Sequence, residues 1–440
     1  MLFRNATLAD GRQRDVRVRG EAIDAVGEGL DATEDERVVD ATGKRLLPGM
    51  IDAHVHFREP GFSHKETWAS GSRSAAAGGV TTVVDQPNTD PPTVTGEAFD
   101  EKLDLAGESL VDFGLNGGVT PDWEPDSLLS RPLFALGEVF LADSTGEMGI
   151  GPELFADALD RAAAADVSVT VHAEDASLFN RSARDRDDAD AWSAYRTARA
   201  EVQAIRQACQ TALDHDTSVH IAHTSTPGGI DVVADAGMTC EVTPHHMFLS
   251  RNDLDDLGTW GRMNPPLRRE KRRQRVFDRV ADGTVDMIAT DHAPHTREEK
   301  DADIWSAPSG VPGVETALPL LLAEARTGRL EYERIRDLTA ANPAEVFGLP
   351  GKGRVAEGYD ADLVLVDPGT TREIRGADLH TACDWTPFEG LQGVFPELTL
   401  VRGRVVYERD GETETFGEAA GQNVRVADVY EQEHSGSAES

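Results

Sequence analysis

PGMIDAHVHFREPG, residues 48–61, is a stretch in which an apolar run ends in two histidines and is followed by a charged pair. Short apolar runs of this kind are typical of buried strands. Because side chains at positions i and i+2 of a strand point to the same face, His54 and His56 are expected to project together from its carboxyl end. Two neighbouring imidazoles can share one divalent metal ion. For an isolated His-x-His pattern, two hydrogen-bonded histidines are the more common outcome, so the metal interpretation needs further ligands nearby.

Similar apolar runs recur between residues 48 and 345, and helix-like segments such as ELFADALDRAAAAD separate most of them. Strands that alternate with helices favour a parallel sheet, and eight such strands predict a (β/α)8, or TIM, barrel. The expected fold class is therefore α/β. The expected strands are residues 50–56, 80–86, 113–119, 134–139, 167–172, 219–223, 239–243 and 285–291.

The two flanks of this barrel have a different pattern. Residues 1–47 contain short strand-like runs such as DVRVRG and AIDAVG, and residues 346–409 contain ADLVLVDP and LTLVRGRVVYERD. We expect both flanks to pair into one small β-domain beside a barrel of residues 48–345. Residues 410–440 are acidic and rich in Gly and Ser, so a mobile tail is expected there.

The composition excludes some partners. Lys and Arg total 43 against 79 Asp and Glu, a formal charge of −36, which argues against nucleic acid or an anionic membrane surface as partner. The acidic residues are scattered, which predicts a hydrated, halophilic surface. The cysteines Cys209, Cys240 and Cys383 lack CxxC spacing, which fits a reducing cytosol. With no signal-like or membrane-spanning run, a cytoplasmic enzyme for a small-molecule substrate is expected, and a homo-oligomer is compatible with the sequence.

Metal-capable residues stand at the carboxyl ends of several expected strands, where the active sites of (β/α)8 barrels lie. One such histidine alone is better explained as a hydrogen-bonded core residue, but so many at one rim indicate a metal centre. Four imidazoles and two carboxylates suit two Zn²⁺ ions per chain, which activate water and polarise a carbonyl. Asp291 would then pass a proton to a leaving nitrogen, which describes hydrolysis of an amide-like bond. The candidate ligands are His54, His56, Glu138, His172, His223 and Asp291.

Several motifs carry a resemblance to a known family: GMIDAHVHFREPG, QPNT, VHAED, IAHTST, TPHH, MNPPLR and ATDHAPH. Together they resemble the dihydroorotases of the cyclic-amidohydrolase superfamily, and KGRVAEGYDADLVLVD resembles that superfamily's returning β-domain. The resemblance implies a zinc enzyme that interconverts dihydroorotate and N-carbamoyl-L-aspartate, the third step of pyrimidine synthesis. It implies that Asp291 is the catalytic acid–base and that Arg58 binds the substrate carboxylate, to which a guanidinium fork is matched. Further substrate contacts are implied for Asn88, Asn264, His295 and the backbone of Ser309 and Gly310.

Some positions depart from the family pattern. Glu138 stands where many relatives have a lysine that bridges the metals after carboxylation. We expect Glu138 to bridge the metals directly, because it lies inside the apolar run, and Asp143 in the loop beyond is its rival. Gln86 replaces the usual Met of QPNT, and Ser309 replaces what is often a large apolar residue. Neither change removes a chemical role.

Three alternatives to a dihydroorotase predict different residues at the site. Hydantoinases and dihydropyrimidinases share the metal ligands, but their substrates lack a ring carboxylate and would not require Arg58 and His295. Allantoinases favour PLN where this chain has PNT, and they tend to lack the residue that matches His295. A non-catalytic homologue, for example a structural partner of a carbamoyltransferase, would have lost ligands that this chain keeps. Dihydroorotase is therefore favoured, and His245 and His246 of TPHH are expected to be structural.

Overall fold

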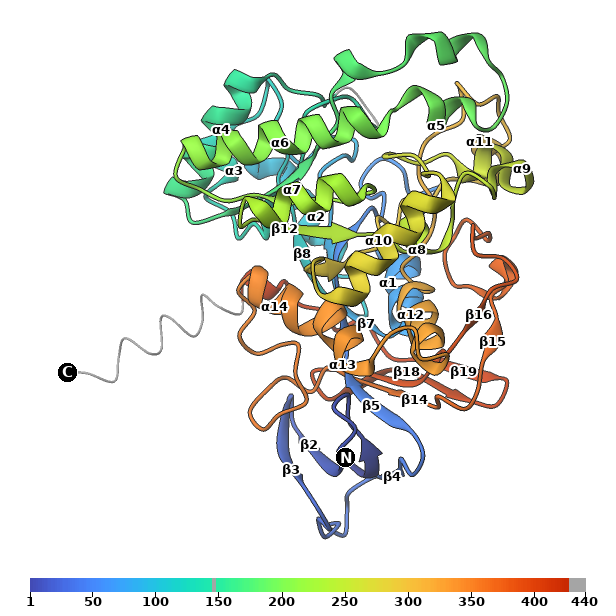
Figure 1. Cartoon of the computed structure of the whole chain (residues 1–440). Helices are drawn as coiled ribbons and strands as arrows, with labels where there is room; N and C mark the ends of the chain where they lie inside the picture. The colour runs from blue at the N-terminus through green and yellow to red at the C-terminus, as the bar shows by residue number, and fades with distance from the viewer. Residues whose placement is uncertain (145–147, 427–440) are drawn as a thin grey trace, which may run out of the picture.

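The computed structural model describes residues 1–144 and 148–426, and its largest part is a barrel of parallel strands (Figure 1). The eight barrel strands are β6 (Met50–Val55), β7 (Val80–Asp85), β8 (Asp112–Leu115), β9 (Ala135–Phe140), β10 (Ser168–His172), β11 (His220–Ile221), β12 (Thr239–Val242) and β13 (Met287–Ile288). Parallel pairing joins β6 to β8 and β9 to β13 in chain order. Bridges from Gly117 to Leu136 and from Val55 to His292 close the ring. The prediction of a (β/α)8 barrel is confirmed.

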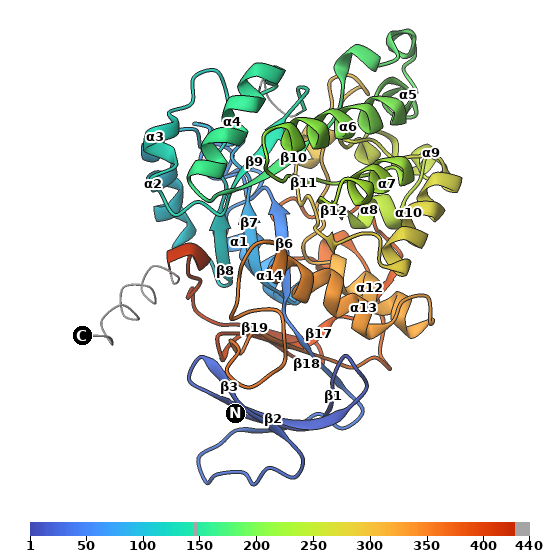
Figure 2. The same cartoon turned by 60° about the vertical axis from the view of Figure 1, so that its left-hand side comes forward.

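Helices cover the outside of the barrel (Figure 2). The first, α1 (Trp68–Gly78), begins after Thr67, whose hydroxyl accepts a hydrogen bond from the Ser70 N–H, and ends at Gly79, where φ is 83°. Only glycine adopts such a φ without strain, and β7 follows at once. The other long helices are α2 (Gly96–Ala106), α4 (Pro152–Ala164), α6 (Ala198–Asp214), α7 (Pro227–Asp235), α10 (Glu270–Asp282) and α12 (Ala317–Arg326). The short ones are α3 (Pro125–Leu128), α5 (Ala191–Tyr195), α8 (Pro244–Phe248), α9 (Leu254–Leu257), α11 (Arg297–Lys300), α13 (Tyr332–Arg336) and α14 (Asn342–Val346).

The main hydrophobic core fills the layer between strands and helices. Val83 of β7, Ala76 of α1 and Phe99 of α2 belong to this one cluster and are all fully buried. Within the described ranges, no helix is both long enough and apolar enough to span a bilayer.

A second sheet lies at the amino-terminal end of the barrel strands and is built from both chain flanks (Figure 1). β5 (Arg45–Pro48), the strand just before the barrel, pairs antiparallel with β14 (Leu363–Val366), and Leu46 lies opposite Leu365. The remaining strands are β1 (Leu2–Thr7), β2 (Gln13–Arg19), β3 (Ala22–Gly27), β4 (Val38–Asp40), β17 (Pro396–Val401), β18 (Arg404–Asp410) and β19 (Thr413–Phe416), with a separate hairpin of β15 (Arg372–Glu373) and β16 (Gln392–Gly393).

The expectation of a mobile tail from residue 410 is wrong for residues 413–426. β19 pairs with β18, and the Phe416 ring packs against the Tyr407 ring. Further on, the Phe113 N–H donates to the carbonyl of Gln422, and Val424 is buried. The acidic composition of this segment gave no sign that Phe416 and Val424 pack against the rest of the protein. Residues 427–440 of the expected tail lie outside the described residues.

Candidate active site

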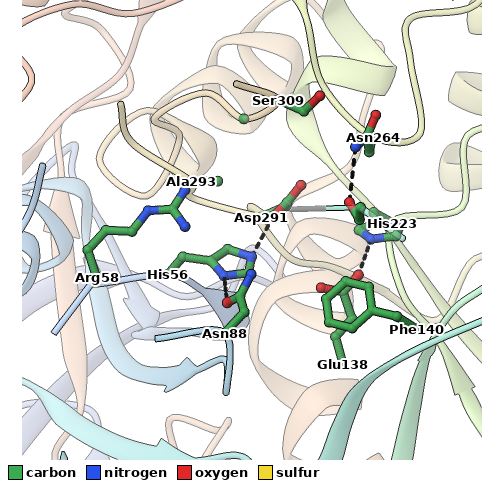
Figure 3. A pocket seen from close by; sticks show the side chains of 12 residues that line it. His56, Arg58, Asn88, Glu138, Phe140, His223, Asn264, Asp291, Ala293 and Ser309 are labelled. Carbon is green, nitrogen blue, oxygen red and sulfur yellow. Dashed lines mark hydrogen bonds and ion pairs between the residues drawn. The ribbon is translucent and has the colours of Figure 1, made fainter. Parts of the chain in front are cut away.

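A pocket lies at the carboxyl ends of the barrel strands (Figure 3). Glu138 is part of β9, whereas His56, His223 and Asp291 follow β6, β11 and β13. His223 and Asp291 have positive φ values of 34° and 47°, an uncommon and strained conformation outside glycine that is concentrated at functional sites. The lining residues are His56, Arg58, Asn88, Glu138, Phe140, Ser144, His223, Asn264, Asp291, Ala293, Ser309 and Gly310.

Two groups of possible metal ligands meet in this pocket. Ligand atoms of His54, His56 and Asp291 lie within 4.8 Å of one another, and so do those of His54, Glu138 and His223. Among the described residues, His54 Nε2 and His223 Nδ1 are buried without a hydrogen-bond partner. A buried nitrogen left unpaired is costly, and neutral imidazole nitrogens with carboxylates are the donors that zinc prefers. The donor set therefore fits a metal centre at this rim.

Glu138 and its rival Asp143 have different surroundings. Glu138 Oε1 lies 2.9 Å from His172 Nδ1 and 2.5 Å from His223 Nε2. Burial alone would raise the pKa of Glu138, but the charges of His223 and His54 hold it well below its usual range. Asp143 is exposed, and its carboxylate accepts a hydrogen bond of 2.9 Å from the Gly149 N–H. Glu138 therefore lies among the candidate histidine ligands and contacts His172 and His223, whereas Asp143 lies outside this group.

Arg58 is a buried cation that faces the pocket (Figure 3). Its Nε donates to the carbonyl of Pro294 over 3.2 Å. Burial lowers its pKa to about 10, so the guanidinium is still charged at neutral pH. In the described part of the chain no carboxylate lies within 4.0 Å of its nitrogens. A buried charge without a partner is strongly unfavourable, and a ligand carboxylate would supply the missing one.

His295 lies directly behind Arg58. Lys65 Nζ lies 3.3 Å from its Nδ1, and its Nε2 lies 3.2 Å from the Arg58 guanidinium and 3.0 Å from the Ser309 carbonyl oxygen. Burial and the charge of Arg58 lower the pKa of His295 to about 3, so the ring is neutral. Gly310 follows Ser309 with φ of 134°, and a Cβ there would meet the Ala293 carbonyl at 2.6 Å. This loop therefore needs glycine to pass close to the pocket.

Both predicted asparagines line the pocket. Asn88 Oδ1 accepts from His56 Nδ1 at 2.7 Å, so Asn88 orients the ring of His56, a candidate metal ligand, and also faces the cavity. Asn264 Nδ2 donates to Ser144 Oγ at 3.0 Å, and its Oδ1 accepts from Trp192 Nε1 at 2.9 Å. All the predicted site residues thus gather at one rim.

Sequence reasoning missed Glu241, which lies in β12, one of the barrel strands that supply no candidate ligand. Its Oε1 accepts from His54 Nδ1 at 2.6 Å and from the His223 N–H at 3.1 Å, and its Oε2 lies 3.2 Å from His220 Nε2. One carboxylate therefore positions two of the imidazoles, as is usual behind metal ligands. The signal was an acid inside the apolar run TCEV.

Glu174 was missed in the same way. Its Oε2 lies 3.1 Å from His172 Nε2, and it accepts from Arg196 Nε at 2.8 Å. Burial would raise the pKa of Glu174, but the charge of Arg196 and the contact with His172 lower it strongly. His172 is thereby fixed from the side opposite Glu138. His246, expected to be structural, has ring nitrogens bonded to Thr243 and to the Pro265 carbonyl.

Comparison with known proteins agrees with this geometry. The model of the amidohydrolase family matches residues 45–406. A dihydroorotase from Halobacterium salinarum is 66% identical over 426 residues, which are 96% of this chain and 99% of that one. A dihydroorotase from Methanosarcina acetivorans is 42% identical, covering 91% of this chain and 89% of its own. An allantoinase from Rubrobacter xylanophilus is 37% identical, covering 93% and 94%.

Solved structures give the same fold. L-hydantoinase from Arthrobacter aurescens superposes with a TM-score of 0.90 at 28% identity, covering 96% of this chain and 98% of its own. Dihydropyrimidinase from Brevibacillus agri gives a TM-score of 0.88, also at 28% identity, over 96% and 98%. These enzymes share the barrel and the second sheet, whereas the much higher sequence identities are to dihydroorotases. The chain therefore belongs to the amidohydrolase family and, within it, to the dihydroorotases.

Proposed function

We propose that this protein is a zinc-dependent dihydroorotase, which interconverts dihydroorotate and N-carbamoyl-L-aspartate in the third step of pyrimidine synthesis. The observation that carries the proposal is Arg58, a buried guanidinium without a carboxylate partner in the described chain, beside two groups of metal-capable side chains. Dihydroorotate has a ring carboxylate that would pair with it. We also expect a cytoplasmic location and no nucleic-acid or membrane partner.

The metal pair would be held by the residues at the rim. His54, His56 and Asp291 form one group, and His54, Glu138 and His223 form the second, in which Glu138 would supply the carboxylate between the metals. The full set is His54, His56, Glu138, His172, His223 and Asp291. Bound zinc would supply Lewis-acid chemistry that activates water and polarises the ring carbonyl.

The side chains around the metals have separate tasks. Arg58 binds the substrate carboxylate, and neutral His295 and the Ser309–Gly310 backbone orient the ring against it. Asn264 offers its amide to the ring from the opposite side. Asp291, a carboxylate 3.0 Å from His56 Nε2, receives the proton of the attacking water and delivers it to the leaving ring nitrogen. In the reverse direction the same carboxylate takes the proton from the carbamoyl nitrogen.

A substrate panel tests the proposal. Zinc-replete protein in molar KCl is assayed with dihydroorotate, N-carbamoyl-L-aspartate, hydantoin and allantoin. We expect turnover in both directions with the first two compounds only. Good turnover of hydantoin or allantoin together with none of dihydroorotate would refute the assignment and place the chain with the hydantoinases or allantoinases.

A further inference from the structure

A second concave site lies on the flank of the barrel and shares no lining residue with the catalytic pocket. It is an open groove of about 620 Å³ bordered by α5, the start of α6 and the start of α10. These helices lie on the same flank in both views (Figures 1 and 2). Seven of the residues that line the groove are Arg or Lys, and none is acidic. We name it the basic groove.

Most of these cations lack an anionic partner. Arg251 is paired with Asp190, and Arg268 donates to Glu201 over 2.8 Å. The other five have no carboxylate within 4.0 Å among the described residues: Arg199, Arg269, Lys271, Arg272 and Arg275. A chain with 79 acidic and 43 basic residues has ample carboxylates to pair them, so the composition does not account for this gathering of unpaired charge.

The position of the cations on the helices adds to the argument. Arg269 is the N-cap of α10, and Lys271 and Arg272 lie in its first turn. The start of α6, with Thr197 as N-cap and Arg199 in the first turn, borders the same groove. The N-terminus of a helix carries partial positive charge, so basic residues there destabilise the helix. Partial burial, followed by the charges of Arg268 and Arg269, lowers the pKa of Arg272. A bound anion would offset each of these costs.

We propose that the basic groove is a binding site for a small soluble anion carrying two or more phosphate groups. Guanidinium forks match phosphate oxygens, and about 620 Å³ is within the range of small-molecule sites. A nucleic acid would extend beyond the groove over a surface of net charge −36, which repels it. The compact anion is therefore the favoured ligand.

The probe is inorganic pyrophosphate, titrated calorimetrically into the zinc-loaded protein at the lowest KCl concentration that keeps it folded. The groove variant is R269Q/R272Q/R275Q, which replaces three exposed, unpaired cations. The matched control is R206Q/R326Q/R354Q, which removes the same charge from exposed arginines elsewhere. Heat from capture of zinc by pyrophosphate would be common to all three proteins, because neither variant alters the catalytic pocket.

We expect one saturable site per chain that weakens as KCl rises. The groove variant should bind at least tenfold more weakly, and the control within about threefold of the parent, with unchanged dihydroorotate turnover in both. Equal weakening by both variants would mean that only net charge attracts the anion, and would overturn the proposal. The absence of a saturable site would also overturn the proposal. If no protein bound pyrophosphate and the groove variant had a different oligomeric mass in solution from the parent, the groove would be a contact between copies of the chain, which would overturn the proposal too.

Discussion

Two buried clusters of charge in this molecule are built on opposite rules. Where the barrel meets the second sheet, Lys352 Nζ donates to Asp112 and Asp362 at 2.8 and 2.5 Å, and Arg402 Nε donates to Asp112 at 3.1 Å. At the catalytic rim, Arg58 has no carboxylate partner in the described chain, and the His54 Nε2 atom has no hydrogen bond. A buried charge is much more costly without a partner than with one. The first cluster is therefore complete within the fold, and the second is incomplete without ligands.

The largest effect is expected from removing a carboxylate of the catalytic rim, which tests whether this cluster needs metal ions to be complete. Glu138→Ala should lose one or both zinc ions and reduce turnover to background, because it removes the carboxylate beside His172 and His223. Asp143→Ala is the matched control and should keep both metals and most of the activity. Metal content by mass spectrometry and steady-state rates measure the outcome. Loss of zinc in the Asp143 variant alone would transfer the bridging role to that residue.

Removing one cation from each cluster sharpens the contrast. Lys352→Met should lower the free energy of unfolding by about 3–5 kcal/mol, because Asp362 then loses its cation and Asp112 keeps only Arg402. Arg58→Met should leave that free energy unchanged or raise it, because it removes a buried charge that has no partner. Denaturant melts of both variants in the same KCl give the comparison. Equal destabilisation by the two would show that both clusters are structural.

Glu241→Gln is a smaller perturbation at the rim. The amide keeps the shape but loses the charge that holds His54 Nδ1 at 2.6 Å, so zinc affinity should fall about 10- to 100-fold. Competition with a chromogenic chelator measures this affinity without relying on turnover. Unaltered zinc affinity would remove Glu241 from any positioning role.

The smallest effect per residue is expected at the surface. Its carboxylates are solvated, and the net charge is −36, so their mutual repulsion should be screened by salt. The melting temperature should therefore rise from low to molar KCl. A melting temperature independent of KCl would contradict the prediction of a halophilic surface.

The sequence predicted the barrel because its strands are short apolar runs between helix-like segments, and the ligands because they stand at strand ends. It could not predict that Arg58 lacks a partner, because pairing depends on residues as distant as Pro294 and His295. Glu241 was overlooked because one acid does not break the pattern of a strand. The segment RREKRRQR, residues 268–275, is basic in sequence, but only the fold separates its paired from its unpaired cations.

The measurement that most directly tests the central claim compares two substrates in two proteins. Dihydrouracil is dihydroorotate without the carboxylate, so the ratio of kcat/KM for the two compounds isolates what that carboxylate contributes. The account predicts that the parent strongly prefers dihydroorotate and that Arg58→Met loses at least about a hundredfold of this preference with full zinc content, since a charged hydrogen-bonded pair in a buried site contributes a few kcal/mol. An Arg58→Met variant with the parent's preference would contradict the account.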